Sequence, residues 1–582
     1  MSHPFPKFSL QTLANELIIV ILEHLDVPSL LKCKQVSRFL ATLITNSVAL
    51  EYKIELYFAH LIDGPPSALS KSARLRLLDD HQRAWNNISW SSTLEIPLTA
   101  AELSTPELSA WELNNGLLAL AANRHLRFIQ LPSRMRGINH REWAFDDIGF
   151  NIRDFAMDRS QDLLVVVERF DPALHDPNEG HLRIHLRSLS TGGPHPLAQD
   201  ETIKYPLPAI TEHDPEPWHV MQIYAGFVAV MVQTVDEEDL ALPSFHSELG
   251  FWDWKSGRRK MIVRGPIHSF AFLSERYVLL GVCRLDPDPP DDVIPDTLPS
   301  LDVIDMSNAA DVLSISEPPI ISELTGTPSP ILCSFAFPPF FHPSTNYYDD
   351  DALRPELSIR TDYSSAIPDL DVPFTTSPRD RLIVVTMNNP ETNREPVTLF
   401  VRASAFLGMI PKARPSLRVF DWEVWGTVHT RMVHIDLSDT WFCYVHGMKA
   451  VVPSTHKAHV VELWDFNLPA VKRGVGLHCL DVPPEARPVQ PSIPARFEGY
   501  VRQRHIMDRV ELNHTSRGNR PTQPTKVFDD NKAVTSLPCR VQTFTTPDPK
   551  GSRNFMMTED SLVLVVSAPF LQDDAKFIIL SF

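Results

Sequence analysis

The chain from residue 13 to residue 31 reads Leu-Ala-Asn-Glu-Leu-Ile-Ile-Val-Ile-Leu-Glu-His-Leu-Asp-Val-Pro-Ser-Leu-Leu. Residues 17–22 of this stretch are all apolar. At 3.6 residues per turn, six residues cover the whole circumference of a helix, so this helix has no polar face. A unit of about fifty residues is too small to enclose one of its own helices completely. Part of the helix surface must therefore contact either the rest of the chain or a separate protein.

The flanking residues predict a small all-α unit over residues 1–50. Thr12 is a candidate N-cap for the first helix. Asp26 is followed by Val-Pro-Ser, which predicts a helix end and a new start, because aspartate caps well and proline is tolerated in a first turn. We expect a second helix over residues 29–35 and a third that ends near Asn46.

A helical linker is expected over residues 51–92. Its main element is a helix from Leu69 to Asn87, because apolar residues recur there at helical spacing. The linker separates the small unit from the long remainder of the chain.

After about residue 92 the pattern changes to short runs of Val, Leu and Phe between turn residues, which is typical of strands. Seven runs resemble one another: Leu117-Leu-Ala-Leu, Leu163-Leu-Val-Val-Val, Phe227-Val-Ala-Val-Met, Val278-Leu-Leu-Gly-Val, Leu382-Ile-Val-Val, Ala450-Val-Val and Leu562-Val-Leu-Val-Val. Several are followed by a second kind of strand with outward charges, such as His125-Leu-Arg-Phe-Ile. Counted from first residue to first residue, the gaps are 46, 64, 51, 104, 68 and 112 residues.

The shorter gaps match a four-stranded propeller blade of roughly 40 to 50 residues. The longer gaps require large loop insertions or a further blade near Ile331, and three Pro-rich stretches (286–299, 337–343 and 482–494) are interpreted as such loops. The predicted fold class is α+β multidomain, with an all-α start and a large all-β domain over residues 93–582. A WD-like β-propeller is favoured for that domain, and a β-sandwich or two unrelated β-domains are the alternatives.

Two further features favour the propeller. The dipeptides Trp252-Asp253 and Trp464-Asp465 stand where a WD-type blade has them. The final residues, 577–582, suit a last strand that closes the ring against the first blade and so removes an exposed sheet edge.

Composition limits the possible partners. The formal net charge is −18, which opposes non-specific attraction to nucleic acid or to an anionic membrane. The longest aliphatic stretches, residues 17–22 and 117–122, are too short to span a bilayer, and the first residues lack the apolar run of a secretory signal. The six widely spaced cysteines indicate reduced thiols. We expect a cytoplasmic or nuclear protein that binds neither nucleic acid nor membrane.

No pattern in the sequence indicates catalysis. It contains no nucleophile elbow, no P-loop and no complete G-x-G-x-x-G motif. His456 and His459 have a spacing seen in metal sites but lack further ligands nearby, and 347–351 lacks the spaced oxygens of a calcium loop. We therefore predict no catalytic residue, no metal and no cofactor.

Residues 13–31, together with Val36-Ser-Arg-Phe-Leu-Ala-Thr-Leu43, resemble the F-box family, whose pattern is a Leu-Pro-x-Glu start, an Ile/Leu-rich helix ending in Leu-Asp, a Ser-Leu-Leu step and a Val-Cys-Arg-x-Trp segment. The matching residues are Leu13, Glu16, Leu17, Ile21, Leu22, Leu25, Asp26, Leu30, Leu31, Val36, Arg38 and Leu43. Ala14, Ser37 and Leu40 depart from the family's proline, cysteine and tryptophan. The residues that follow, 50–64, look like those of a large set of fungal F-box proteins that continue into a propeller-like region.

The resemblance implies a partner and a role. F-box helices dock on a Skp-type adaptor, which joins the cullin and RING subunits of an SCF ubiquitin ligase, and the remainder of the chain holds an unknown protein substrate. The adaptor-binding residues carried over are Leu13, Glu16, Leu17, Ile18, Ile21, Leu22, Leu25, Leu30, Leu31, Val36 and Leu40.

The expected function is thus that of a non-catalytic substrate receptor. One alternative is an interaction protein that uses its F-box outside a ligase, or that packs the F-box only on its own propeller. A propeller-fold hydrolase is a third hypothesis. It would require convergent polar groups in the central channel, and the sequence shows no such set.

Overall fold

The structure is a computed structural model that describes the following residues: 13–99, 101–102, 109–169, 181–206, 219–235, 245–285, 297–307, 312–316, 331–338, 356–363, 372–378, 380–388, 396–413, 418–435, 444–453, 460–470, 501–507, 535, 537–547, 554–566 and 575–582. The expected N-cap Thr12, the pair His456 and His459, and residues 347–351 lie outside these ranges.

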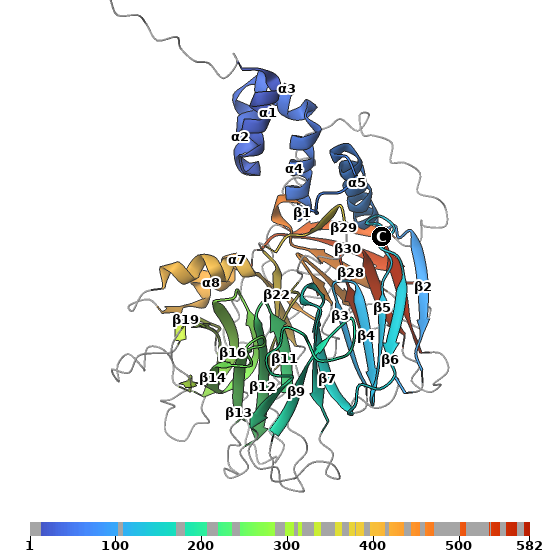
Figure 1. Ribbon diagram of the computed structural model, residues 1–582. Coiled ribbons are helices and arrows are strands. Elements are labelled where there is room, and N and C mark those ends of the chain that lie inside the picture. The colour runs from blue at the N-terminus through green and yellow to red at the C-terminus, as the bar shows by residue number, and fades with distance from the viewer. Residues whose placement is uncertain are drawn as a thin grey trace, which may run out of the picture.

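The chain starts with four short helices: α1 (Asn15–Glu23), α2 (Val27–Val36), α3 (Arg38–Asn46) and α4 (Val48–Ala59). The side chain of Asp26 accepts a hydrogen bond from the backbone N–H of Ser29 (2.9 Å), and Pro28 stands in the first turn of α2, as predicted. Figure 1 shows α1, α2 and α3 as a compact group above the sheets, while α4 runs down toward them.

The linker contains the end of α4, a short strand β1 (Leu61–Asp63) and the helix α5 (Lys71–Asn87). The N-cap of α5 is Ser70, whose hydroxyl accepts from the N–H of Ala73 (3.2 Å). The expected helix from Leu69 to Asn87 therefore exists and begins two residues later.

Seven sheets form a closed seven-bladed propeller; each has four antiparallel blade strands, and three of the sheets carry a fifth strand at the edge. The first three blades are β3 (Ser109–Asn114), β4 (Leu117–Ala122), β5 (His125–Gln130), β6 (Arg141–Phe145); β7 (Ile152–Asp158), β8 (Leu163–Glu168), β9 (His181–Ser188), β10 (Thr202–Pro206); and β11 (His219–Tyr224), β12 (Phe227–Val235), β13 (Phe245–Asp253), β14 (Arg259–Gly265).

The next three blades are β15 (Ile267–Phe272), β16 (Tyr277–Leu285), β17 (Thr297–Asp305), β19 (Ile331–Ala336); β20 (Glu356–Thr361), β22 (Leu382–Asn388), β23 (Val397–Arg402), β25 (Thr430–His434); and β26 (Val445–His446), β27 (Lys449–Pro453), β28 (Val460–Asp465), β30 (Cys539–Thr545). The last blade is β31 (Asn554–Met557), β32 (Ser561–Val566), β33 (Lys576–Ser581) and β2 (Ser92–Pro97).

The remaining elements do not belong to the four strands of any blade. They are the strands β18 (Val312–Ser314), β24 (Val419–Phe420), β29 (Val501–Met507) and β21 (Phe374–Thr376), the helices α7 (Ala403–Met409) and α8 (Trp422–His429), and the 3-10 turns η2 (Arg159–Gln161) and η5 (Ile410–Lys412). In Figure 1, α7 and α8 project from the side of the propeller.

Each of the seven similar runs is the second strand of one blade: β4, β8, β12, β16, β22, β27 or β32. A second strand has a partner on both sides and a neighbouring blade on both faces, so most of its residues are shielded from water and polar and apolar residues need not alternate along it. The prediction of a propeller is confirmed, and the sandwich alternative is wrong.

Within the described ranges, the longer gaps between runs contain no further blade. Ile331–Ala336 is β19, the fourth strand of the fourth blade, so the idea of a separate blade there is wrong. Each Trp-Asp dipeptide stands at the end of the third strand of its blade, one in β13 and the other in β28. One Pro-rich stretch is partly misassigned as a loop, because Pro299 lies inside β17, where its carbonyl accepts from the N–H of Phe337 (3.1 Å).

The ring closes through strands from opposite ends of the sequence. The last strand, β33, pairs along its whole length with β2, from Ser92 opposite Ser581 to Pro97 opposite Lys576. The final strand therefore closes the ring, as expected, but β2 is the outer strand of the last blade and not a part of the first. The pairing supplies the fourth strand of this blade from the other end of the chain, so backbone hydrogen bonds hold the ring closed.

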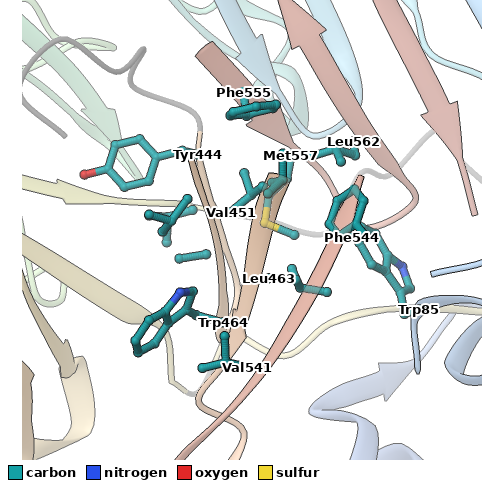
Figure 2. Close-up of a cluster of buried hydrophobic side chains, with 14 of the residues drawn as sticks. Trp85, Tyr444, Val451, Leu463, Trp464, Val541, Phe544, Phe555, Met557 and Leu562 are labelled. Carbon is teal, nitrogen blue, oxygen red and sulfur yellow. The ribbon is translucent and has the colours of Figure 1, made fainter. Parts of the chain in front are cut away.

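The largest buried cluster joins the sixth and last blades to the linker (Figure 2). Trp85 of α5 is buried there and stacks on Phe582, with ring centroids 4.0 Å apart. Leu463 of β28 and Leu562 of β32 belong to the same cluster. The linker thus packs into the propeller and is not a free tether.

Candidate functional sites

Helix α1 divides its apolar residues between a buried and an exposed side. Ile18 (0% exposed) and Leu22 (3%) pack into the core of the helical unit. Leu17 (54%), Val20 (51%) and Ile21 (45%) remain open to solvent. They stand at i, i+3 and i+4, so they lie on one side of the helix. We call these three residues the α1 face.

The residues carried over from the resemblance occupy three environments. Ile18, Leu22 and Leu30 are buried. Leu13, Leu25, Leu31 and Leu40 are half-buried and pack against the same core. Glu16, Leu17, Ile21 and Val36 are exposed. The carried-over set omits Val20, although its spacing from Leu17 and Ile21 could have revealed it.

The propeller does not cover the α1 face. The cluster around Ile18 and Leu22 contains only residues between 13 and 58. Leu17, Val20 and Ile21 stay exposed with the propeller present, and Figure 1 shows the group of α1, α2 and α3 standing apart from the blades. Within the described part of the chain, no other surface therefore covers the exposed side of this apolar helix.

A first polar junction fixes the linker to the propeller. Arg74 of α5 is buried and donates to the carbonyl oxygens of Gly64 and Pro373 (both 3.1 Å) and to Asp63 (2.6 Å). The hydroxyl of Tyr52 donates to the same Pro373 carbonyl (2.9 Å). Beside it, β1 pairs antiparallel with β21. Gly64 is required here, because a Cβ atom at this position would overlap the carbonyl oxygen of Val372.

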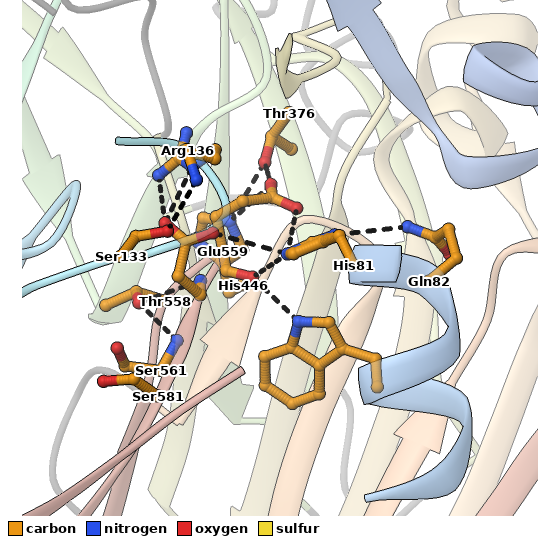
Figure 3. Close-up of polar contacts among 12 residues, drawn as sticks. His81, Gln82, Ser133, Arg136, Thr376, His446, Thr558, Glu559, Ser561 and Ser581 are labelled. Atoms are coloured by element: carbon orange, nitrogen blue, oxygen red, sulfur yellow. Dashed lines mark hydrogen bonds and ion pairs between the residues drawn. The ribbon is translucent and has the colours of Figure 1, made fainter. Parts of the chain in front are cut away.

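A second junction joins α5 to the turn between β31 and β32 (Figure 3). The indole N–H of Trp85 donates to the carbonyl of Glu559 (2.9 Å), and His81 Nε2 lies 3.1 Å from the same oxygen. His81 Nε2 also lies 3.4 Å from Asp560, whose carboxylate accepts from the Nε–H of Arg136 (2.7 Å). The linker is therefore held at two separate points.

His446 connects the second junction to the propeller centre. Its Nδ1 lies 2.9 Å from Asp362 and its Nε2 3.4 Å from Glu559, and Thr376 also donates to Glu559. Burial by itself would lower the pKa of His446, but the charge of Asp362 and hydrogen bonds to both carboxylates raise it to about 9. Burial would raise the pKa of Glu559, and the hydrogen bond from His446 holds it well below its ordinary value.

A cavity of about 850 Å³ occupies the centre of the propeller. Its lining comes from all of the inner strands except β15, and from the turns that lead from an inner strand to a second strand. Thr376 and Ser377 also line it, so the strand that pairs with β1 forms part of its rim. The cavity therefore borders the linker.

Polar groups converge in this cavity from distant parts of the chain. They are Glu112, Arg153, Asp154, Asp158, His219, Gln222, Arg360, Asp362, Tyr363, Asp380, Arg381 and His446. The sequence showed no such set, because these residues come from five blades and share no local motif. No group of His, Cys, Asp and Glu side chains suited to a metal ion occurs among the described residues.

Comparison with known families decides what the helical unit is. The sequence model of the F-box domain matches residues 10–50. Residues 10–50 are an F-box domain. The predicted resemblance is confirmed, and the chain is an F-box protein with a propeller region. Within this F-box, Ala14 occupies the N-cap position of α1 without a side-chain hydrogen bond, and Leu40 is half-buried.

Other comparisons add little. No curated protein matches the chain. Among solved structures, Kluyveromyces lactis Hsv2 is 9% identical, with a TM-score of 0.18, over 50% of this chain and 92% of that one. The same protein with a complete loop 6CD is 10% identical, with a TM-score of 0.16, over the same shares. Similarity this low supports no inference, so the assignment of a propeller depends only on the sheets that this chain forms. No described helix is long and apolar enough to cross a membrane.

Proposed function

We propose that this protein is the substrate-receptor subunit of an SCF-type E3 ubiquitin ligase. In this proposal the F-box binds a Skp-type adaptor, which brings the cullin and RING subunits, and the propeller binds a protein target. The observation that carries the proposal is the α1 face: an F-box domain that leaves Leu17, Val20 and Ile21 exposed away from its own propeller. A contiguous apolar face of this kind is typical of a protein-binding surface.

The linker supports the same role. A receptor acts by holding its target at a high effective concentration near the transferring enzyme, and this requires a defined distance between the two ends. The junctions at Arg74 and at Trp85 fix the position of α5 on the propeller. In the proposal the chain does no bond chemistry itself.

The proposal places the protein in the cytosol or nucleus. The cysteines within the described ranges (Cys33, Cys283, Cys333 and Cys539) are free thiols, as expected in a reducing compartment. The net charge of −18 remains the reason to expect neither nucleic acid nor a membrane as partner.

The adaptor-binding assignment is tested by substitution on the α1 face. Leu17→Asp combined with Ile21→Asp places two charges on the face, and we expect adaptor affinity to fall by at least about 100-fold. Val424→Asp with Val428→Asp is the matched control, because these valines are 58% and 57% exposed on α8, outside the F-box. Adaptor binding that survives the α1 substitutions would refute the assignment.

A second candidate function is an interaction protein that uses its F-box outside a ligase. Purification of the tagged chain from cells separates the two functions. The receptor proposal requires cullin to co-purify with the adaptor, and requires the double α1 variant to lose both. Adaptor without cullin would favour the second candidate. The receptor's target could then be sought among proteins whose ubiquitination depends on this chain.

A further inference from the structure

One wall of the central cavity carries polar atoms that the fold leaves without partners. The wall is formed by the adjacent inner strands β3, β7 and β11. Within the described residues, Glu112 Oε2, Asn114 Oδ1 and His219 Nε2 are buried and make no hydrogen bond. The His219 side chain is only 6% exposed, and its nearest acidic oxygen, on Asp154, is 3.6 Å away. A buried polar atom without a partner is costly, so the wall is suited to a polar ligand.

The charge on this wall indicates the sign of that ligand. Burial, and then the negative charge of Asp154, raise the pKa of Glu112 well above its ordinary value. Asp158 adds a further negative charge, although its oxygens are occupied by Ser160 and Gln161. A positive charge beside Glu112 would relieve this repulsion and let the carboxyl group ionise.

Most of the cationic groups around the same cavity are already engaged, and among them Arg381 Nε is buried without a hydrogen bond. His446 contacts two carboxylates, and the guanidinium of Arg381 donates to the Phe272 carbonyl and lies over the rings of Tyr224 and Tyr363, at 5.5 and 5.0 Å. Arg153 and Arg360 also line the cavity, and both have interaction partners. An anion would have to compete with these contacts for every cationic group except Arg381 Nε, whereas a cation would meet Glu112 Oε2, which has no partner, beside the negative charge of Asp154.

We infer that the β3–β7–β11 wall receives a basic side chain, lysine or arginine, from an extended segment of the protein target. The inference rests on the proposed receptor function only for the source of that segment. The cavity volume of about 850 Å³ suits such a ligand.

The test uses the full chain and short peptides. Acetyl-Gly-Gly-Lys-Gly-Gly-amide and its arginine analogue are compared with the glutamine and glutamate analogues by isothermal titration calorimetry. The basic peptides are expected to bind at least about tenfold more tightly. Titration near neutral pH in two buffers of different ionisation enthalpy is expected to show proton release, as Glu112 ionises. Equal binding of the glutamine peptide, tighter binding of the glutamate peptide, or no binding at all would overturn the inference.

Substitutions locate the effect. Glu112→Gln keeps the shape of the protonated side chain, and we expect it to weaken the basic peptides about tenfold and to abolish proton release. Asp154→Asn provides a second variant if Glu112→Gln does not fold. Glu275→Gln, in an exposed turn outside the cavity, should change neither quantity. Unchanged peptide binding by folded Glu112→Gln and Asp154→Asn proteins would refute the site.

Adaptor binding is measured on the same samples. If the chain binds the adaptor but no basic peptide, the cavity inference fails and the proposed function stands. If it binds basic peptides but no adaptor, the proposed function fails and the cavity inference stands.

Discussion

Two apolar runs of equal length differ in how far they are buried in this molecule. Residues 17–22 form part of α1, and residues 117–122 form β4. All six residues of β4 are buried, whereas half of the run in α1 is exposed. Leu118 and Leu120 of β4 pack toward the last blade, while Leu117 and Ala119 pack toward the second.

The difference shows that a continuous apolar run does not by itself reveal its surroundings. A second strand of a closed propeller has a neighbour on every side, so other parts of the same chain bury its apolar residues. A helix in a unit of four short helices has neighbours on one side only. The exposed remainder of α1 therefore indicates a partner, and the buried run of β4 indicates a fold.

The largest effect is expected from a charge inside the buried run. Leu120→Asp places a carboxylate between two blades without a partner, and we expect it to destabilise the propeller by at least about 4 kcal/mol. Soluble yield and denaturant unfolding measure the loss. The same change at Leu17, which is exposed, is the matched comparison. Equal losses at both positions would contradict the difference in burial.

The next effect concerns pH at the junction between linker and propeller. The pKa of His446 is about 9 in the folded protein against an ordinary value of 6.5, so the folded state binds the extra proton between these values. Its contribution, up to about 3 kcal/mol, is complete below pH 6.5 and disappears as the pH rises through 9.

Unfolding free energy measured from pH 6 to pH 9.5 should therefore fall as the pH rises. His446→Gln should remove most of this slope, and His125→Gln, at an exposed position, should keep it. A slope that is the same in all three proteins would rule out His446 as its source.

A smaller effect is expected at the first linker junction. Arg74→Ala removes the side-chain donor to the Gly64 carbonyl and one of the donors to the Pro373 carbonyl and to Asp63, at a cost of about 2 kcal/mol. Hydrogen exchange should quicken at β1 and β21. Lys71→Ala removes an exposed ion pair with Asp63 and a cation–π contact with the Tyr52 ring, so it should cost less than about 1 kcal/mol. Exchange at β1 and β21 that is unaffected by Arg74→Ala would mean that this junction does not hold the linker.

The smallest effect on stability is expected on the α1 face. Val20→Asp should change the unfolding free energy by less than about 0.5 kcal/mol, because the residue is half exposed and contacts solvent. It should nevertheless weaken adaptor binding, as measured by calorimetry with the purified adaptor. Val424→Asp is the control for both quantities. A Val20→Asp protein with normal affinity would limit the proposed adaptor surface to Leu17 and Ile21.

Much of the fold could be predicted from local sequence. Asp26 and Pro28 define the start of α2 because capping depends on residues only three apart. The seven similar runs identify the second strands of all seven blades, because complete burial imposes the same apolar composition on each. The F-box could be recognised for the same reason, since its pattern is contiguous.

Only the tertiary structure decided the features that join distant residues. The pairing of β2 with β33, and the meeting of His81, His446 and Glu559, connect positions more than 100 residues apart, so no local spacing records them. The wall of Glu112, Asp154 and His219 arises because three inner strands are brought around one axis. The sequence alone required the apolar helix to seek another surface. The packing of Ile18 and Leu22 inward then determined that Leu17, Val20 and Ile21 are the residues left to meet it.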